Sequence, residues 1–188
     1  MVRWEPDARG RLAQAAMALY GECGFDSTTV ADIAERAGLT ERTFFRHFPD
    51  KREVLFDGAG LLQELLVTTV ADAPESLSPL DAVGAGLYAV GEMLQERREF
   101  SRQRQAIIAA SAELRERELI KLASLSAALA DTLRRRGVPE PDASLTAEAG
   151  IAVFRIAFER WVQETNGREL PELMRDSLDH LRAVTSET

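Results

Sequence analysis

Residues 27–56 read STTVADIAERAGLTERTFFRHFPDKREVLF, and the pattern of this stretch decides the fold of the N-terminal part of the chain. Thr29 is a candidate N-cap, with Asp32 three residues later to complete the cap. The apolar residues recur with the spacing of one helix face: Val30, Ile33, Ala34 and Ala37. We therefore predict a short helix from Thr29 to Ala37.

A second short helix is expected after a tight turn. Gly38 ends the first helix, and Thr40 can cap the next one, which reaches about His47. The step from Phe48 to Pro49 should stop it, because the residue before a proline disfavours the helical conformation. Two short helices joined by a glycine-containing turn match a helix-turn-helix in size.

The second of these helices has two distinct faces. Phe44 and Phe48 lie four residues apart and should face the core. Arg42, Phe45 and Arg46 share the opposite face and should point outward. An arginine can make a bidentate contact to guanine, worth roughly 1 to 3 kcal/mol of discrimination, so this face is a candidate surface for reading DNA.

The rest of the chain also has a helical pattern, so we predict an all-α protein of about nine helices. No alternating strand pattern persists. A first helix should end near Gly21 and Gly24, and a fourth should start at Asp50 and continue past Val70. Further helices are predicted at about 79–97, 100–111, 113–136, 142–166 and 170–185.

Composition limits the class of protein. The chain has 188 residues, of which 45% are hydrophobic, so it can bury a substantial core. We find neither a secretory signal nor an apolar run of the roughly 18 residues that a membrane span needs, and we expect a soluble, cytoplasmic protein. The single cysteine, Cys23, cannot form an internal disulfide or a cysteine-built metal site, and no metal or cofactor is predicted.

The net charge of −8 is unusual for a protein that binds nucleic acid, because phosphate contacts normally leave a basic surface. The charge is unevenly distributed, however. Residues 1–53 carry eight basic and nine acidic side chains, whereas residues 54–188 carry fifteen and twenty-two.

We assign a three-helix helix-turn-helix domain to residues 1–50 and a larger helical bundle to residues 51–188.

The stretch quoted above closely resembles the N-terminal domain of the TetR (tetracycline repressor) family of transcriptional regulators. The upstream segment ARGRLAQAAMALYGECGF matches the first helix of the same family. Together they cover residue 9 to about residue 56, and the combined TTV, DIA, AG, FxHF and K pattern is highly specific. The resemblance implies a dimer that binds double-stranded operator DNA and whose C-terminal domain senses an unknown small molecule.

The resemblance also implies roles for individual residues. Those implied to contact DNA are Thr28, Thr29, Thr40, Glu41, Arg42, Thr43, Phe45, Arg46, His47 and Lys51. Thr28, Thr29 and Lys51 match phosphate contacts. The family most often has tyrosine in place of Phe45, whose ring cannot donate a hydroxyl hydrogen bond, so Phe45 is expected to contact sugar or a thymine methyl group. His47 lies between the two faces, and DNA contact and a structural hydrogen bond both stay open.

Some of these basic residues also have plainer interpretations. Arg42 and Arg46 could be an ordinary solvated face of the helix. Arg3 and Arg9 either form an arm that reaches into a minor groove or belong to a solvated segment. The run at 134–136 could be a second basic patch, but cations in the last turn of a helix complement its dipole, which is the interpretation we favour.

The C-terminal part carries the predicted dimer interface. Residues 145–162, LTAEAGIAVFRIAFERWV, are apolar on more than one face, and the predicted helix at 170–185 is amphipathic. Pairing these two helices with their copies would bury both. A four-helix homodimer interface through the last two helices is what the resemblance implies.

Candidate effector-binding residues are Tyr88, Met93, Gln103, Arg155 and Phe158. Arg155 is the odd residue in an apolar helix, because a buried charge is costly unless it is paired. It could meet an acidic group of a ligand. Alternatively, it forms an internal ion pair or reaches solvent.

The predicted function is a sequence-specific transcriptional regulator, a ligand-responsive repressor of a palindromic operator. An activator, or an interaction module that has lost DNA binding, is the alternative. We expect no enzyme and no catalytic residue, because the only two histidines are His47 and His180, and no phosphate loop, metal-binding histidine pair or nucleophile motif is found.

Overall fold

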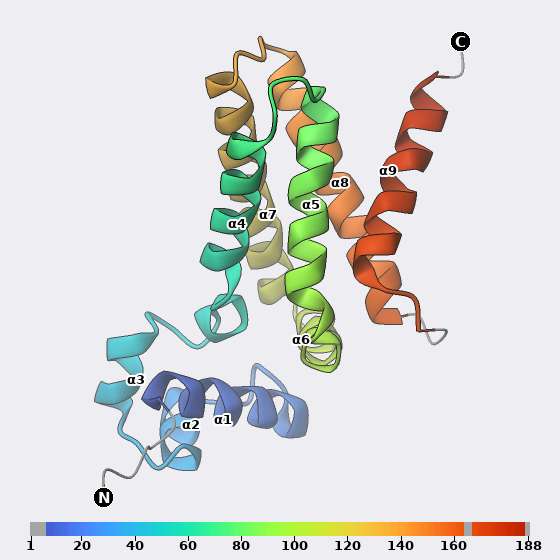
Figure 1. Cartoon of the computed structure of the whole chain (residues 1–188). Helices are drawn as coiled ribbons and strands as arrows, with labels where there is room; N and C mark the ends of the chain where they lie inside the picture. The colour runs from blue at the N-terminus through green and yellow to red at the C-terminus, as the bar shows by residue number, and fades with distance from the viewer. Residues whose placement is uncertain (1–6, 164–166, 187–188) are drawn as a thin grey trace, which may run out of the picture. The chain divides into compact units, whose positions relative to one another are not determined.

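The computed structural model describes residues 7–163 and 167–186, and every regular element in these ranges is helical (Figure 1). The all-α prediction is confirmed. The elements in chain order are α1 (Ala8–Cys23), α2 (Val30–Arg36), α3 (Glu41–His47), the short 3₁₀ helix η1 (Glu53–Phe56), α4 (Ala59–Asp72), α5 (Pro79–Gln95), α6 (Arg98–Ala110), α7 (Ala112–Arg135), α8 (Asp142–Gln163) and α9 (Leu170–Ser186).

The chain forms two compact units. Unit 1 comprises Met1–Gly58 and Gln103–Arg117, and unit 2 comprises Ala59–Arg102 and Glu118–Thr188. The assignment of separate functions to residues 1–50 and 51–188 stays a prediction, because compactness alone does not assign a function.

Unit 1 is built around the helices α1, α2 and α3. Its core consists of apolar side chains from all three helices and from η1, including Leu12, Ala16, Tyr20, Ile33, Phe44, Phe48 and Leu55, all of them buried. Burial of each large apolar side chain stabilises the fold by about 1.5 to 3 kcal/mol. The short helices therefore owe their stability to this shared core, because isolated helices of seven residues are unstable in water.

The segment between α3 and α4 differs from the prediction. One continuous fourth helix was expected, but the structure has η1 and then a break at Asp57 and Gly58 before α4. Asp50 accepts the predicted capping hydrogen bonds from the backbone N–H groups of Arg52 (2.8 Å) and Glu53 (3.2 Å). Glycine disfavours the helical conformation, so Gly58 allows the chain to leave it here.

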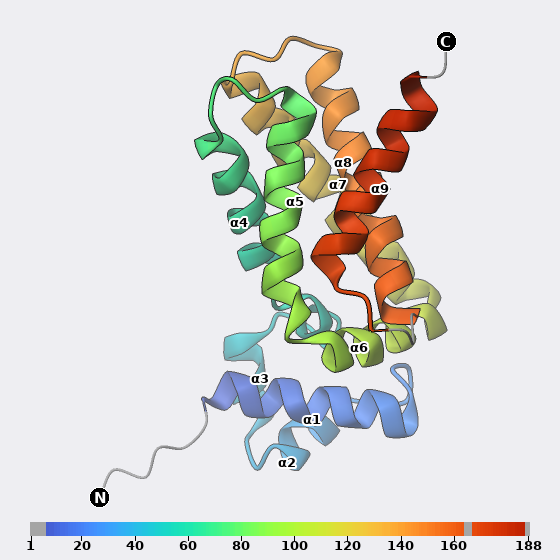
Figure 2. The ribbon, with the colours of Figure 1, turned by 45° about the vertical axis from the view of Figure 1, so that its right-hand side comes forward.

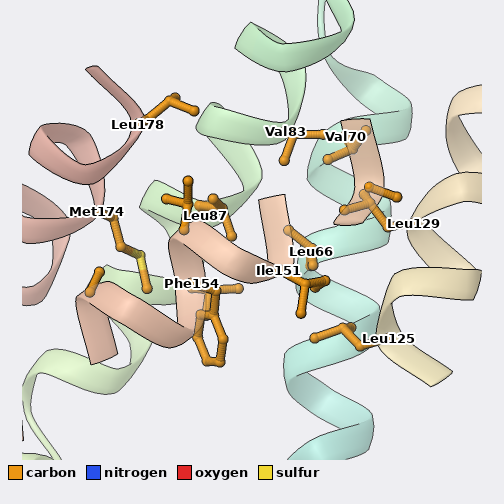
Figure 3. Close-up of a cluster of buried hydrophobic side chains, with 14 of the residues drawn as sticks. Leu66, Val70, Val83, Leu87, Leu125, Leu129, Ile151, Phe154, Met174 and Leu178 are labelled. Atoms are coloured by element: carbon orange, nitrogen blue, oxygen red, sulfur yellow. The ribbon is translucent and has the colours of Figure 1, made fainter. Parts of the chain in front are cut away.

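Unit 2 is a helical bundle in which α5 lies between α4 and α9, and α8 packs against α5 and α9 (Figures 1 and 2). Leu66 and Val70 of α4 and Leu87 of α5 are buried in its core together with Ile151 and Phe154 of α8. Figure 3 shows these side chains together with those of α7 and α9. The core is apolar throughout, so it holds the bundle together by burial and close packing.

Most of the apolar face of α9 is already buried inside the chain. Leu170, Leu173, Met174 and Leu178 are all under 9% exposed, and α9 packs against α5 and α8. Val184 of the same face is 69% exposed, and the pairing of α9 with its copy in a second chain stays a prediction. Amphipathicity shows that a helix has an apolar side, but it does not say what covers it.

One stretch of the described chain, Glu53–Asp72, is long and apolar enough by composition alone to cross a membrane, with a mean hydropathy of 1.4. The stretch is not a continuous apolar run, because Glu53, Asp57, Glu64 and Asp72 lie in it. The helix of a protein core passes the same test, and Leu66 and Val70 are indeed buried in unit 2. The stretch is weak evidence for a membrane span.

Candidate DNA-binding site

The start of α2 is fixed by the predicted capping box. The hydroxyl of Thr29 accepts a hydrogen bond from the backbone N–H of Asp32 (3.1 Å), and the backbone N–H of Thr29 donates to the Asp32 carboxylate (2.8 Å). The Thr29 hydroxyl also donates to this carboxylate, and these hydrogen bonds lower the pKa of Asp32. A reciprocal cap satisfies two backbone donors that would otherwise lack partners.

The turn between α2 and α3 is a Schellman motif. The backbone N–H of Leu39 donates to the carbonyl of Ala34 (2.8 Å), and that of Gly38 donates to Glu35 (2.9 Å). Gly38 has a φ of 65°, a conformation that glycine adopts without the steric penalty of a side chain. The guanidinium of Arg11 donates to the carbonyl of Ala37 at the end of α2. The turn is thereby held to α1.

The orientation of α3 agrees with the predicted two faces. Phe44 is 0% exposed and Phe48 is 1% exposed, and their ring centroids lie 5.5 Å apart. On the opposite face, Phe45 is 54% exposed, and Arg42 and Arg46 are also exposed. Two cations and an aromatic ring therefore point outward from a helix that is anchored by its other side.

The remaining predicted contacts on α3 lie around this face. Thr40 caps the helix by accepting from the backbone N–H of Thr43 (3.2 Å), and Glu41 is exposed in the first turn. His47 is half-buried, and its Nε2 lies 3.5 Å from the guanidinium of Arg46. The structure thus gathers these residues with the exposed arginines on one side of unit 1.

Thr28 is placed differently from the prediction. Its side chain is 2% exposed, and its hydroxyl donates to the carbonyl of Gly24 (2.8 Å). The buried hydroxyl therefore has a structural role in the loop before α2, and the phosphate contact of Thr28 stays a prediction. Thr29 is exposed, but its hydroxyl is engaged with Asp32.

Lys51 also contacts the protein itself. Its ammonium group donates to the carbonyls of Phe25 (2.8 Å) and Thr28 (2.8 Å) and lies 4.3 Å from the centroid of the Phe25 ring. The hydroxyl of Tyr20 donates to the backbone carbonyl of Lys51 (2.6 Å). Lys51 therefore ties the loop before α2 to the segment after α3, and its predicted phosphate contact stays untested.

We expect Lys51→Met to lower the free energy of unfolding of unit 1 by about 1 to 3 kcal/mol, because two carbonyls lose a charged donor. Urea denaturation followed by hydrogen exchange in α2 would measure this loss. Arg42→Met, which removes an exposed cation from the same unit, is the control and should leave stability nearly unchanged. Equal stability of both variants would argue against the structural role.

Arg9 does not belong to a free arm. Its guanidinium forms an ion pair with Asp57, with Nε 2.9 Å from the carboxylate, and lies 5.0 Å from the centroid of the Phe48 ring. The alternative of a groove-binding arm is therefore wrong for Arg9. Arg3 lies outside the described residues.

The five candidate effector residues lie on three helices, α5, α6 and α8. Gln103 belongs to unit 1, where it donates to the carbonyl of Met17 (3.3 Å). Tyr88 and Met93 are exposed on α5, and Phe158 is half-buried on α8. Arg155 is exposed and lies 3.9 Å from Glu159, so its charge reaches solvent and is not buried in the chain.

The basic run at the end of α7 has partners within its own unit. Arg134 forms ion pairs with Asp131 and Glu140. Arg136 donates to the carbonyls of Ala71 (3.1 Å) and Ala73 (2.6 Å) at the end of α4. These contacts favour the structural interpretation of the run over a second nucleic-acid patch.

No group of three or more His, Cys, Asp or Glu side chains is placed to hold a metal ion among residues 7–163 and 167–186.

Comparison with known proteins identifies both halves of the chain. A family model described as "Bacterial regulatory proteins, tetR family" matches residues 12–57, and one described as "MftR C-terminal domain" matches residues 77–186. The HTH-type transcriptional regulator TtgR of Pseudomonas putida is 28% identical over 95% of this chain and 86% of its own length. TcmR of Streptomyces glaucescens is 34% identical over 44% of this chain.

The chain spans only 36% of the length of TcmR and less than half of the other first curated relatives. Among solved structures, the SmeT–triclosan complex has a TM-score of 0.69 at 23% identity, over 95% of this chain and 91% of SmeT. This likeness concerns the fold, which is the same arrangement of helices with an N-terminal helix-turn-helix.

Proposed function

Because this chain belongs to the TetR family of bacterial regulatory proteins, we propose that it represses transcription by binding a palindromic operator as a homodimer and that a small molecule regulates it. The family consists of transcriptional regulators and not of enzymes. We place the protein in the cytoplasm, where its operator would be.

The observation that carries the proposal is the exposed face of α3. Arg42, Phe45 and Arg46 point outward, while Phe44 and Phe48 hold the helix in the core of unit 1. Such a helix can enter a major groove, in which arginine reads guanine and an apolar ring contacts a thymine methyl group. The net charge of −8 does not oppose this, because the contacts that read bases are local.

The experiment is a fluorescence anisotropy titration of the purified protein against the DNA upstream of its own gene. We expect saturable binding at a stoichiometry of two chains per site, weakened steeply by salt, because cationic contacts release counterions from DNA. Unrelated DNA of equal length is the control. Equal binding to both DNAs would contradict a sequence-specific regulator.

We propose that the homodimer forms through the outward stripe of α8. This stripe consists of Leu145, Ala149, Ala152 and Ile156, spaced by four, three and four residues. Leu145 is 64% exposed and Ile156 is 47% exposed. The spacing is that of a coiled-coil seam, and the two central alanines allow close approach of a second helix.

The α8 stripe is self-complementary when two copies run antiparallel. A two-fold axis between Ala149 and Ala152 would set Leu145 against the partner's Ile156. The same axis would bring Arg155 towards the partner's Glu148, a pair of opposite charge at the edge of the stripe. A symmetric dimer requires such a patch to match itself. The contribution of α9 to the interface stays part of the prediction.

We expect Ala152→Glu to weaken dimerisation at least about tenfold, because it places two like charges side by side at the centre of the interface. Sedimentation velocity across a concentration series would measure the change. Ala123→Glu, at an exposed alanine of α7, is the control. If the Ala152→Glu variant dimerised as strongly as the wild type, the interface could not be the α8 stripe.

We propose that the effector contacts the aromatic cluster of α8, which consists of Phe154, Phe158 and Trp161. Trp161 is fully buried, and its indole N–H has no acceptor among the described residues. The Phe158 ring centroid lies 5.7 Å from that of Trp161. A buried N–H without an acceptor is costly, so a polar atom of a ligand there would be stabilising. To shift the protein from mostly bound to mostly released, the effector must bind the DNA-free conformation roughly 10⁴-fold more tightly than the DNA-bound conformation.

A further inference from the structure

A small groove lies between α5 and α9 in unit 2, and the residues of the aromatic cluster of α8 are not among those that line it. Its volume is about 180 Å³. It is lined by Asp81, Gly84, Leu87 and Tyr88 of α5 and by Met174, Arg175, Leu178 and Arg182 of α9. Its lining therefore combines an apolar part with charged groups at the surface.

The floor of the groove is apolar. Leu87, Met174 and Leu178 are 1%, 2% and 6% exposed and belong to the core shown in Figure 3. A Cβ atom added at Gly84 would lie only 2.7 Å from Cδ2 of Leu178, so glycine is what allows α9 to come this close to α5. A cavity of roughly 150 Å³ is sufficient for benzene, so this one has room for a single ring.

Of the two arginines that line the groove, one has no ion pair among the described residues. Asp81 forms an ion pair with Arg182, which also bonds to Asp179 (2.7 Å). Arg175 has no ion pair among the described residues, and its guanidinium lies 5.3 Å from the centroid of the exposed Tyr88 ring. Because Arg182 is already engaged with Asp81 and Asp179, Arg175 is the cation of this lining that can meet an anion.

We propose that this groove binds a small aromatic carboxylate, with the ring on the apolar floor and the carboxylate on Arg175. A guanidinium and a carboxylate match in charge and in planar hydrogen-bonding geometry. The Tyr88 ring holds the guanidinium at the mouth, because a cation over an aromatic face is attracted to it. The site goes beyond the proposed regulation of DNA binding and does not depend on it.

The test is direct binding of benzoate and of neutral benzamide to the full chain, by calorimetry and by amide chemical-shift changes in α5 and α9. We expect benzoate to bind about five- to tenfold more tightly than benzamide, because only benzoate forms the ion pair. No DNA is present, so failure of this site is distinguishable from failure of the regulator.

Arg175→Gln should weaken the binding of benzoate about five- to tenfold and change the affinity for benzamide by less than about twofold. Arg97→Gln is the matched control, since Arg97 also lies over an exposed ring, that of Phe100, 5.0 Å from its centroid, but does not line the groove. The Arg97→Gln variant should bind benzoate and benzamide with the same affinities as the wild type. Absence of saturable benzoate binding, or equal loss in both arginine variants, would overturn the proposal.

Discussion

The Arg42→Ala, Arg46→Ala double variant is expected to bind operator DNA at least about 100-fold more weakly than the wild type. Each arginine is worth roughly 1 to 3 kcal/mol if it contacts a base in bidentate fashion, and the two are placed on one exposed face of α3. Fluorescence anisotropy at fixed salt would measure the loss.

The matched control for this double variant removes the same number of charges from the same unit. Arg36 and Arg115 are both exposed; Arg36 forms an ion pair with Glu22, and Arg115 donates to the carbonyl of Ala109. Their replacement by alanine should change affinity far less. If both double variants lost affinity equally, the effect would be one of net charge, and α3 would not be the reading helix.

Phe44→Ala is expected to destabilise unit 1 by about 3 to 5 kcal/mol, which is a large part of the stability of a small domain. Its side chain is 0% exposed and packs against both Phe45 and Phe48, with ring centroids 5.5 Å apart in each case. Loss of this ring leaves a cavity at the base of α3. Hydrogen exchange should show faster opening of α1, α2 and α3.

Phe45→Ala is the matched control for this prediction, since it removes the same ring from the neighbouring position. Phe45 is 54% exposed, so the expected change in stability is within about 0.5 kcal/mol. The Phe45→Ala variant should instead bind DNA more weakly. A similar loss of stability in both variants would contradict the two-faced orientation of α3.

The helix-turn-helix could be predicted from the sequence because its determinants are local. The cap at Thr29, the turn at Gly38 and the separation of Phe44 from Phe45 all depend on residues close together in the chain. Helical periodicity places such residues relative to one another without any tertiary information. The structure agrees with each of these predictions.

The role of Lys51 could not be predicted in this way. Its ammonium contacts carbonyls 23 and 26 residues away, and no local spacing encodes such contacts. A clue exists in Tyr20, a buried tyrosine whose hydroxyl needs a partner and finds it in the carbonyl of Lys51. Arg11, which donates to Ala37 from 26 residues away, was missed for the same reason.

The sequence by itself determined that the chain is helical, where most of its helices begin and end, and which side of α3 faces outward. Only the tertiary structure decided that Thr28 is buried, that Arg155 is exposed, and that α9 buries most of its apolar face inside its own chain. The physical reason is that hydrogen bonds and periodicity within a helix act over a few residues, whereas burial depends on which distant segments pack together.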